Sequence, residues 1–180
     1  LDGDAPPMQS SGTYSLASSS VRSTIYSSQT VSFALDRIDQ RTLPLDRTYS
    51  HPATGKGVTV AITDAYASPY IAQDAARYAK DTGGQKYRKG QLSQVLPADY
   101  NSTEDCDAGG WYGEETLDVE AVHAVAPDAD IVYVGGASCF DNDLLDALNK
   151  VVDNHLADIV SNSWGDVEAN ETPDIAAAYD

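Results

Sequence analysis

The fold of this chain is decided by the stretch GWYGEETLDVEAVHAVAPDADIVYVGG at residues 110–136. Its apolar residues recur at helical spacing and predict a helix over 113–125. The β-branched run that follows predicts a strand over 130–134, and the pair Gly135-Gly136 predicts a turn after it. A helix joined to a strand by a short connection is a building unit of α/β proteins.

The same alternation continues on both sides of this stretch. Before it, GVTVAITD at 57–64 predicts a buried strand, and Ser68-Pro69 predicts the start of a helix. Residues 81–110 predict a long loop with one short strand near 92–96. After it come a helix from Asp141, a strand at 158–164 and a helix at 172–180. This order predicts an α/β fold with a parallel β-sheet and helices on both faces.

Folds of this class place their chemistry at the carboxyl ends of the strands. Three positions of this chain are predicted to lie there: Asp64, the Gly135-Gly136 turn, and Ser163-Trp164-Gly165. Functional residues are therefore expected at these ends and on the helix over 113–125.

Composition excludes several classes of function. The chain has 180 residues, enough for one domain, and carries 28 acidic against 11 basic residues for a net charge of −17. Such a charge argues against nucleic-acid binding, which requires a basic face. No apolar run approaches the ~20 residues of a membrane span. Two cysteines, two glycosylation sequons and no leader-like start favour an extracellular, secreted protein whose signal peptide has been removed.

The first 54 residues differ in character from the rest. Residues 1–33 hold ten serines between Ser10 and Ser32 and are interpreted as a Ser-rich linker or propeptide remnant. Residues 34–54 are expected to form an extended segment on the surface of the domain. The ordered core is expected to begin at about residue 55.

Two acids, Glu114 and Asp118, stand four residues apart in the predicted helix, which places them one above the other on one face. If they are buried, their repulsion raises one pKa, and such a pair suits general acid–base chemistry in acid. Alternatively, they belong to a solvated helix start that the helix dipole favours. Glu115 and Glu120 are expected on the solvated face of this helix.

Three blocks of the chain resemble one protein family. They are VAITDAYASP (60–69), GWYGEETLDVEAVHAVAPDADIVYVGGASC (110–139) and DLLDALNKVVDNHLADIVSNSWG (143–165). Together they resemble the sedolisins, which are serine-carboxyl peptidases with a subtilisin-like fold, and the similarity extends over about residues 55–180. The resemblance implies that Glu114 is the general base and that Asp118 is its partner. Asp64 would be an outer member of the carboxylate network or a plain turn acid, and Trp164 would line the cleft or pack in the core.

Other parts of the family pattern are absent from this sequence. Members of the family carry the nucleophile in a Gly-Thr-Ser setting, and no such triplet occurs here. The aspartate that stabilises the oxyanion and the calcium site of the C-terminal half are also missing. The resemblance therefore implies the N-terminal half of a peptidase domain, with the rest supplied downstream or by a second chain. Residues 34–50 instead resemble the start of subtilisin-type proteases of the proteinase K class.

Cys106 and Cys139 flank the acidic helix, and they form either one disulfide or two separate thiols. A disulfide would hold the loop that presents Glu114.

The sequence thus predicts a secreted serine-carboxyl endopeptidase that hydrolyses peptides or unfolded proteins at acidic pH, with no metal or cofactor in this part of the chain. This chain alone is expected to be inactive. The alternative is a non-catalytic α/β fragment that binds peptides or another protein.

Overall fold

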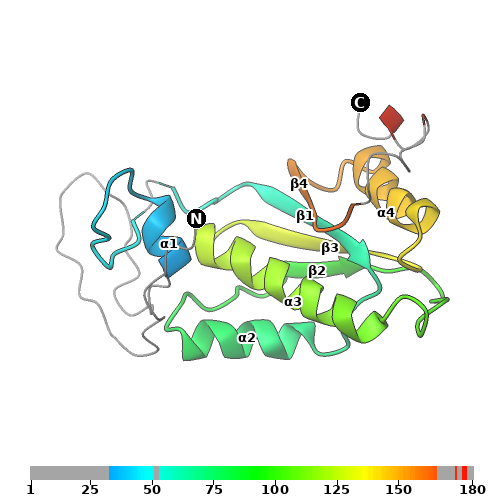
Figure 1. Ribbon diagram of the computed structural model, residues 1–180, viewed down its shortest axis with the longest axis horizontal. Helices are drawn as coiled ribbons and strands as arrows, with labels where there is room; N and C mark the ends of the chain where they lie inside the picture. Colours follow the sequence, from blue (N-terminus) through cyan, green and yellow to red (C-terminus); the bar gives the residue numbers. More distant parts are fainter. Residues whose placement is uncertain (1–32, 51–52, 166–172, 174–175, 178–180) are drawn as a thin grey trace, which may run out of the picture.

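The computed structural model describes residues 33–50, 53–165, 173 and 176–177 (Figure 1). The serine-rich segment and most of the helix expected at 172–180 lie outside these residues. The elements are α1 (Phe33–Ile38), β1 (Thr59–Ala65), α2 (Ile71–Asp81), β2 (Leu92–Val95), α3 (Ala108–Val125), β3 (Asp130–Gly136), α4 (Asp141–Asp153) and β4 (Ile159–Asn162). No helix in the described part of the chain is both long enough and apolar enough to cross a membrane.

The four described strands form one parallel sheet in the order β2-β3-β1-β4. β1 and β3 occupy the centre, and both are buried along nearly their whole length. Asp64 pairs with Gly135 and Thr63 pairs with Asn162, so the carboxyl ends of β1, β3 and β4 lie together. The predicted α/β architecture with a parallel sheet is confirmed.

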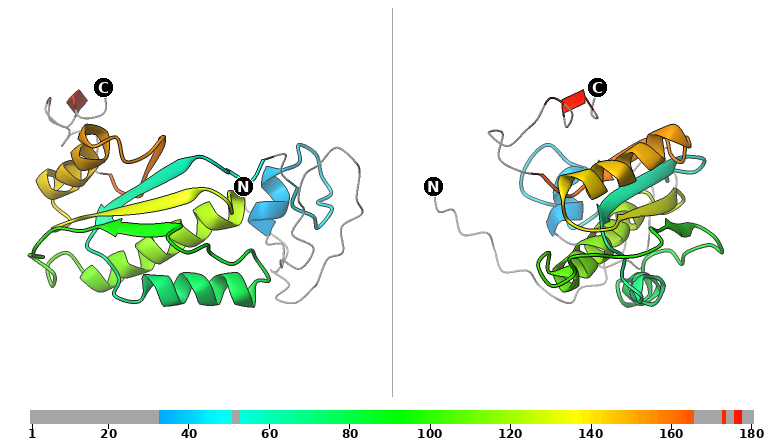
Figure 2. Two further views of the ribbon diagram at one scale, coloured as in Figure 1. Left: turned by 180° about the vertical axis from the view of Figure 1, so that it is seen from behind. Right: turned by 90° about the vertical axis from the view of Figure 1, so that its right-hand side faces the viewer.

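Helices cover both faces of the sheet. On one face, Ile62, Ile131 and Tyr133 pack with residues of α2 and α3. On the other face, the alternate residues Ala61, Val132 and Val134 pack with Ala147 and Val151 of α4. The end-on view shows α4 on one side of the sheet and α2 and α3 on the other (Figure 2). This alternation is the period-two pattern of a strand buried on both sides.

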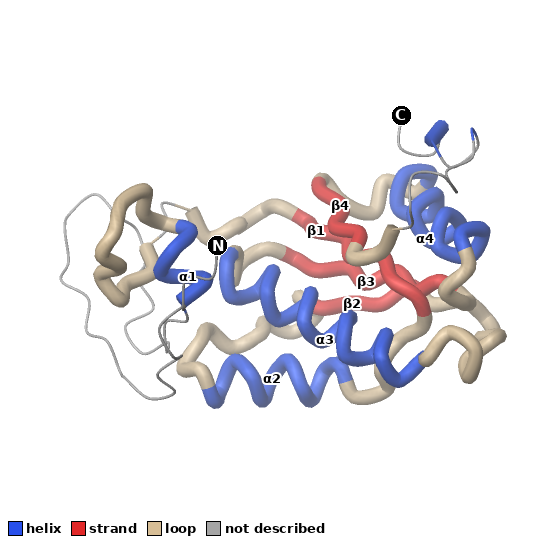
Figure 3. Tube along the Cα trace, in the orientation of Figure 1, coloured by secondary structure: helices blue, strands red, loops and turns tan. Residues whose placement is uncertain are grey.

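The segment at 34–54 differs from expectation. It was expected to be extended, but it begins with the helix α1, whose Leu35 is buried against Tyr49 and Ala124. Figure 3 shows residues 39–50 as loop, near the C-terminal end of α3. Burial of one apolar side chain against α3 thus favours a helical turn that the short FALDRI pattern does not reveal.

A tight turn fixes the carboxyl end of β1. Tyr66 has a φ of 64°, its backbone N–H donates to Gly136, and its carbonyl accepts from the Tyr133 hydroxyl at 2.8 Å. A Cβ at position 135 would stand 2.5 Å from the Tyr66 carbonyl oxygen, so only glycine fits there. Gly135 and Gly136 were predicted to form a turn, but they are the last residues of β3, where Gly135 leaves room for the bend of the chain at Tyr66.

Candidate functional site

Helix α3 begins five residues earlier than the sequence predicts. Asp107 is its N-cap residue, has a φ of 49°, and accepts a hydrogen bond from the Gly110 backbone N–H through its side chain. Such a cap satisfies one of the free amides of the first turn, so residues that look like a glycine-rich loop become helical. The earlier start means that Glu114 lies in the second turn of α3 rather than in the first.

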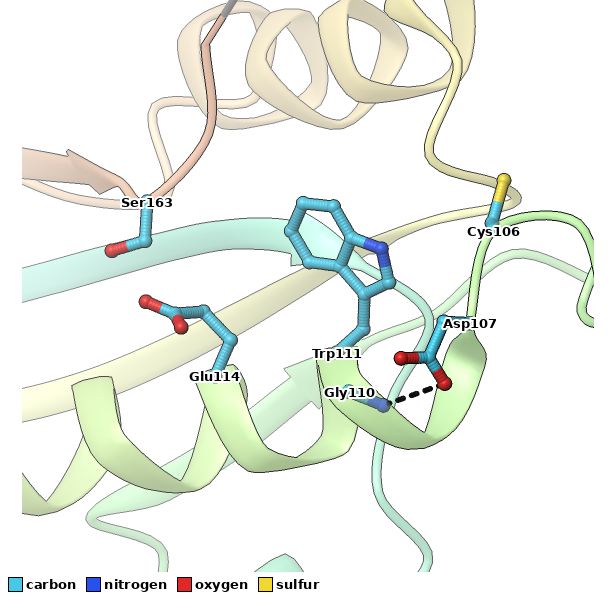
Figure 4. A pocket seen from close by; sticks show the side chains of 6 residues that line it. All are labelled: Cys106, Asp107, Gly110, Trp111, Glu114 and Ser163. Atoms are coloured by element: carbon cyan, nitrogen blue, oxygen red, sulfur yellow. Dashed lines mark hydrogen bonds between the residues drawn. The ribbon is translucent and has the colours of Figure 1, made fainter.

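Beside this end of α3 lies an open pocket of about 210 Å³. It is lined by Cys106, Asp107, Gly110, Trp111, Glu114 and Ser163. The Glu114 carboxylate extends from α3 toward Ser163, which follows β4, and the Trp111 ring stands between these two residues and the Asp107 end (Figure 4). The predicted site residue Glu114 is therefore at a pocket, and it faces a serine from another element.

Asp118 also turns toward β4. The Ser163 hydroxyl donates a hydrogen bond of 2.6 Å to Asp118 Oδ2. Ser163 thus connects the two predicted acids, because it lies in the pocket with Glu114 and bonds directly to Asp118. The sequence placed Ser163 at a strand end but gave no sign of this contact, which joins residues 45 positions apart.

Asp64 is fully buried near the same place. Burial first, and then the negative charges of Asp118 and Glu114, raise its pKa to about 7, and the Ser163 backbone N–H opposes them only in part. Neither Asp64 carboxylate oxygen has a hydrogen-bond partner among the described residues. Because the Ser163 N–H is the one donor in the described part of the chain that acts on this carboxyl and makes no well-formed hydrogen bond to it, the buried group is more stable in its neutral form, and Asp64 holds a proton in acidic solution.

Trp164 packs next to these acids. Its indole N–H donates to the Thr63 carbonyl at 2.9 Å, and its ring packs on a cluster that includes Ala65, Tyr66 and Leu144. Thr63 itself donates to the Asn162 side chain. Trp164 is therefore a partly buried packing residue that fixes the segment after β4 onto the end of β1.

Glu115 was expected on the solvated face, and this prediction is wrong. Its side chain is 0% exposed and accepts hydrogen bonds from the Ser68 backbone N–H and, at 3.0 Å, from the Gln94 side chain. Burial raises the pKa of Glu115 to about 7, although both hydrogen bonds act in the opposite direction. Glu115 and the buried Val119 are four residues apart, so they lie on the same, core-facing side of α3. The apolar Val119 could therefore have indicated from the sequence that Glu115 is buried.

Glu120 is also not on a solvated face. It is partly buried, and its pKa is raised to about 6, first by burial and then by the charge of Asp74 on α2. His123 is a buried packing residue that stacks on Tyr87 with ring centroids 3.7 Å apart. Its Nε2 lies 2.6 Å from the Gln85 carbonyl, and burial lowers its pKa. His123 does not line the pocket, and its contacts with Tyr87 and Gln85 assign it to the packing of α3.

Cys106 and Cys139 form a disulfide in the structure. It joins the residue just before the N-cap of α3 to the loop between β3 and α4. Because Cys106 lines the pocket, this bond also fixes one wall of the pocket.

Within the described ranges, no group of three or more His, Cys, Asp or Glu side chains is arranged to hold a metal ion.

The predicted site residues Glu114, Asp118, Asp64 and Trp164 thus meet at one end of the sheet, with Ser163 between the acids. Neither models of known protein families nor curated protein sequences give a match to this chain.

Proposed function

We propose that this chain carries the carboxylate half of a serine-carboxyl peptidase site of the sedolisin type, on a subtilisin-like fold. In this proposal Glu114 is the general base, Asp118 positions it, and the nucleophilic serine comes from a downstream segment or a second chain. The substrates are peptides or unfolded proteins outside the cell, and the reaction runs at acidic pH.

One observation carries the proposal. Three carboxyl groups from two elements, Asp64 of β1 and both Glu114 and Asp118 of α3, gather at the carboxyl ends of parallel strands. Like charges repel, and no arginine or lysine of the described residues neutralises them by an ion pair. A fold tolerates such a cluster at a cost in stability, which favours a functional reason for it.

The chemistry follows from the different surroundings of the three acids. Glu114 lies at the open pocket, where its carboxylate can take a proton from an incoming hydroxyl. A carboxylate remains ionised in acid, where a histidine base would be charged and unable to accept a proton. Asp64 holds its own proton below about pH 7 and adds no charge to the site there.

Exposed apolar side chains along the β4 edge and along α3 support a missing second half. β4 is an edge strand of the described sheet, and its Ile159 is 54% exposed. Leu117 and Val125, on the adjacent helix α3, are also exposed. Edge strands and apolar patches of this kind are usually covered by further parts of a domain or by a partner.

The alternative is a peptide-binding or interaction module without catalysis. Its support is that the hydroxyl nearest to the acids, that of Ser163, donates to Asp118 and is therefore committed to that contact. In that case the pocket would bind a ligand without changing it.

Cleavage of an unfolded protein from about pH 3 to pH 7 decides between these functions. The 180-residue chain should be inert, and a version extended through a segment with the nucleophile should cleave in acid. Glu114→Gln should abolish this activity, whereas the matched change Glu104→Gln, at an exposed glutamate of the preceding loop, should not. Activity that survives Glu114→Gln, or a longer version that never cleaves, would overturn the peptidase assignment.

A further inference from the structure

The pocket beside α3 has two chemically different ends. At one end are the Glu114 carboxylate, assigned above as the general base, and the Ser163 hydroxyl, which donates to Asp118. At the other end is the carboxylate of Asp107, next to the backbone of Gly110 (Figure 4). The indole of Trp111 stands between the two ends and forms an aromatic wall.

The Asp107 end is negatively charged and unpaired. The six lining residues include no lysine, arginine or histidine, and the ion pairs of the described residues lie elsewhere, on α2, on α4 and between Arg88 and Asp130. Among the described residues, the Asp107 side chain accepts a hydrogen bond from the Gly110 N–H at 3.3 Å, so its carboxylate has acceptor capacity left. Asp107 is exposed, so a ligand can reach it.

An aromatic face next to a free carboxylate is the combination that selects an organic cation. The ring attracts the cation through its π face, and the carboxylate accepts charge-assisted hydrogen bonds from it. A neutral apolar group of the same size would cover the carboxylate without pairing it, which is unfavourable. The planar guanidinium of arginine fits better than the lysine ammonium, because it can stack on the indole and bond the carboxylate at once.

We propose that this pocket binds a basic side chain, arginine before lysine, of the peptide substrate, with Trp111 and Asp107 as the residues that select it. This proposal rests on the proposed function, because the bound peptide is a substrate only if the site is a peptidase site. A volume of about 210 Å³ is sufficient for one side chain and too small for a folded partner. Binding at the Asp107 end leaves Glu114 at the other end free to act as a base.

Ligand binding can be tested on the 180-residue chain without any catalytic activity. The chain contains two tryptophans, so the indole N–H region of a proton–nitrogen NMR spectrum has two signals, and Trp111→Phe identifies one of them. The probes are agmatine, which carries a guanidinium, and its neutral urea analogue. Agmatine should shift the Trp111 signal in a saturable way, and the urea analogue should not.

Asp107→Asn is the decisive variant. An asparagine oxygen still accepts from Gly110, so the N-cap and the fold should persist, which far-UV circular dichroism verifies. Loss of one charge-assisted contact should weaken agmatine binding about tenfold. Asp99→Asn, at an exposed loop aspartate, is the control and should bind agmatine like the parent chain.

Three results would overturn the proposal: no shift of the Trp111 signal, equal shifts with both probes, or unchanged affinity in Asp107→Asn. Failure of the peptidase assignment looks different. In that case the longer version would not cleave in acid, while agmatine binding and its dependence on Asp107 would persist.

Discussion

Asp64 gives the sharpest test of the electrostatics of the site. It is fully buried, neither of its oxygens has a hydrogen-bond partner among the described residues, and Asp118 and Glu114 are close enough to raise its pKa. We predict that Asp64→Asn removes much of the decline in stability that the parent chain shows as the pH rises. An asparagine has nearly the same shape as the protonated aspartic acid and cannot ionise.

The size of the effect follows from linkage between protonation and folding. The pKa of Asp64 rises from the ordinary value of 3.8 to about 7 in the folded chain. The folded state then binds the proton more tightly than the unfolded state, so the stabilisation is complete below about pH 4 and is lost as the pH rises to about 7. At about 1.4 kcal/mol for each pKa unit, the parent chain should lose about 4 kcal/mol of unfolding free energy relative to Asp64→Asn across this range.

The assay is urea unfolding followed by tryptophan fluorescence, repeated at several pH values from about pH 4 to pH 8. The buried Glu115 and the partly buried Glu120 contribute slopes of the same sign, but they are present in both proteins and cancel in the comparison. Asp99→Asn, at an exposed residue, should follow the parent curve. Parallel curves for the parent and Asp64→Asn would refute the reasoning, because they would mean that Asp64 is ionised and solvated in the folded chain.

Two further predictions concern the groups that hold the site in place. Replacing Glu115 by alanine should lower the unfolding free energy by about 2–4 kcal/mol at about pH 5, because the Ser68 N–H and the Gln94 amide lose their acceptor and a cavity remains. Urea unfolding measures this change, and a loss below about 1 kcal/mol would contradict the buried position of Glu115. Replacing Cys106 and Cys139 together by alanine should cost about 3–4 kcal/mol in the chain-entropy model, for a separation of 33 residues. Mass spectrometry after alkylation without reductant checks the bond directly, and two alkylated cysteines in the parent chain would show that it is absent.

Much of the fold could be read from local patterns. β-branched runs at 57–64 and 130–134 predicted the two central strands, and the first was predicted to be buried. The carboxyl-end positions Asp64, Gly135-Gly136 and Ser163 were likewise predictable, because parallel strands end at the same edge of a sheet. The helix at 33–38 was missed, since its stability depends on the distant Tyr49 and Ala124.

The candidate site was predictable only in part. The spacing of Glu114 and Asp118 determined that they share a face of α3, because helical geometry is local. Helical periodicity does not say which face meets the core, and α3 is nearly without amphipathic character: its Leu117 is exposed and its Glu115 is buried. That choice was made by the positions of the sheet and of α2.

The sequence by itself therefore determined the strands and helices of the sheet region, their parallel arrangement and the pair of acids on one helix, but not α1 or the start of α3. Only the tertiary structure decided that Asp64 lies fully buried beside them, that Ser163 donates to Asp118 across 45 residues, and that Asp107 and Trp111 form a pocket with Glu114. The physical reason is one of range. Propensity and periodicity act over a few residues, whereas burial and the field of neighbouring charges depend on which distant segments the fold brings into contact.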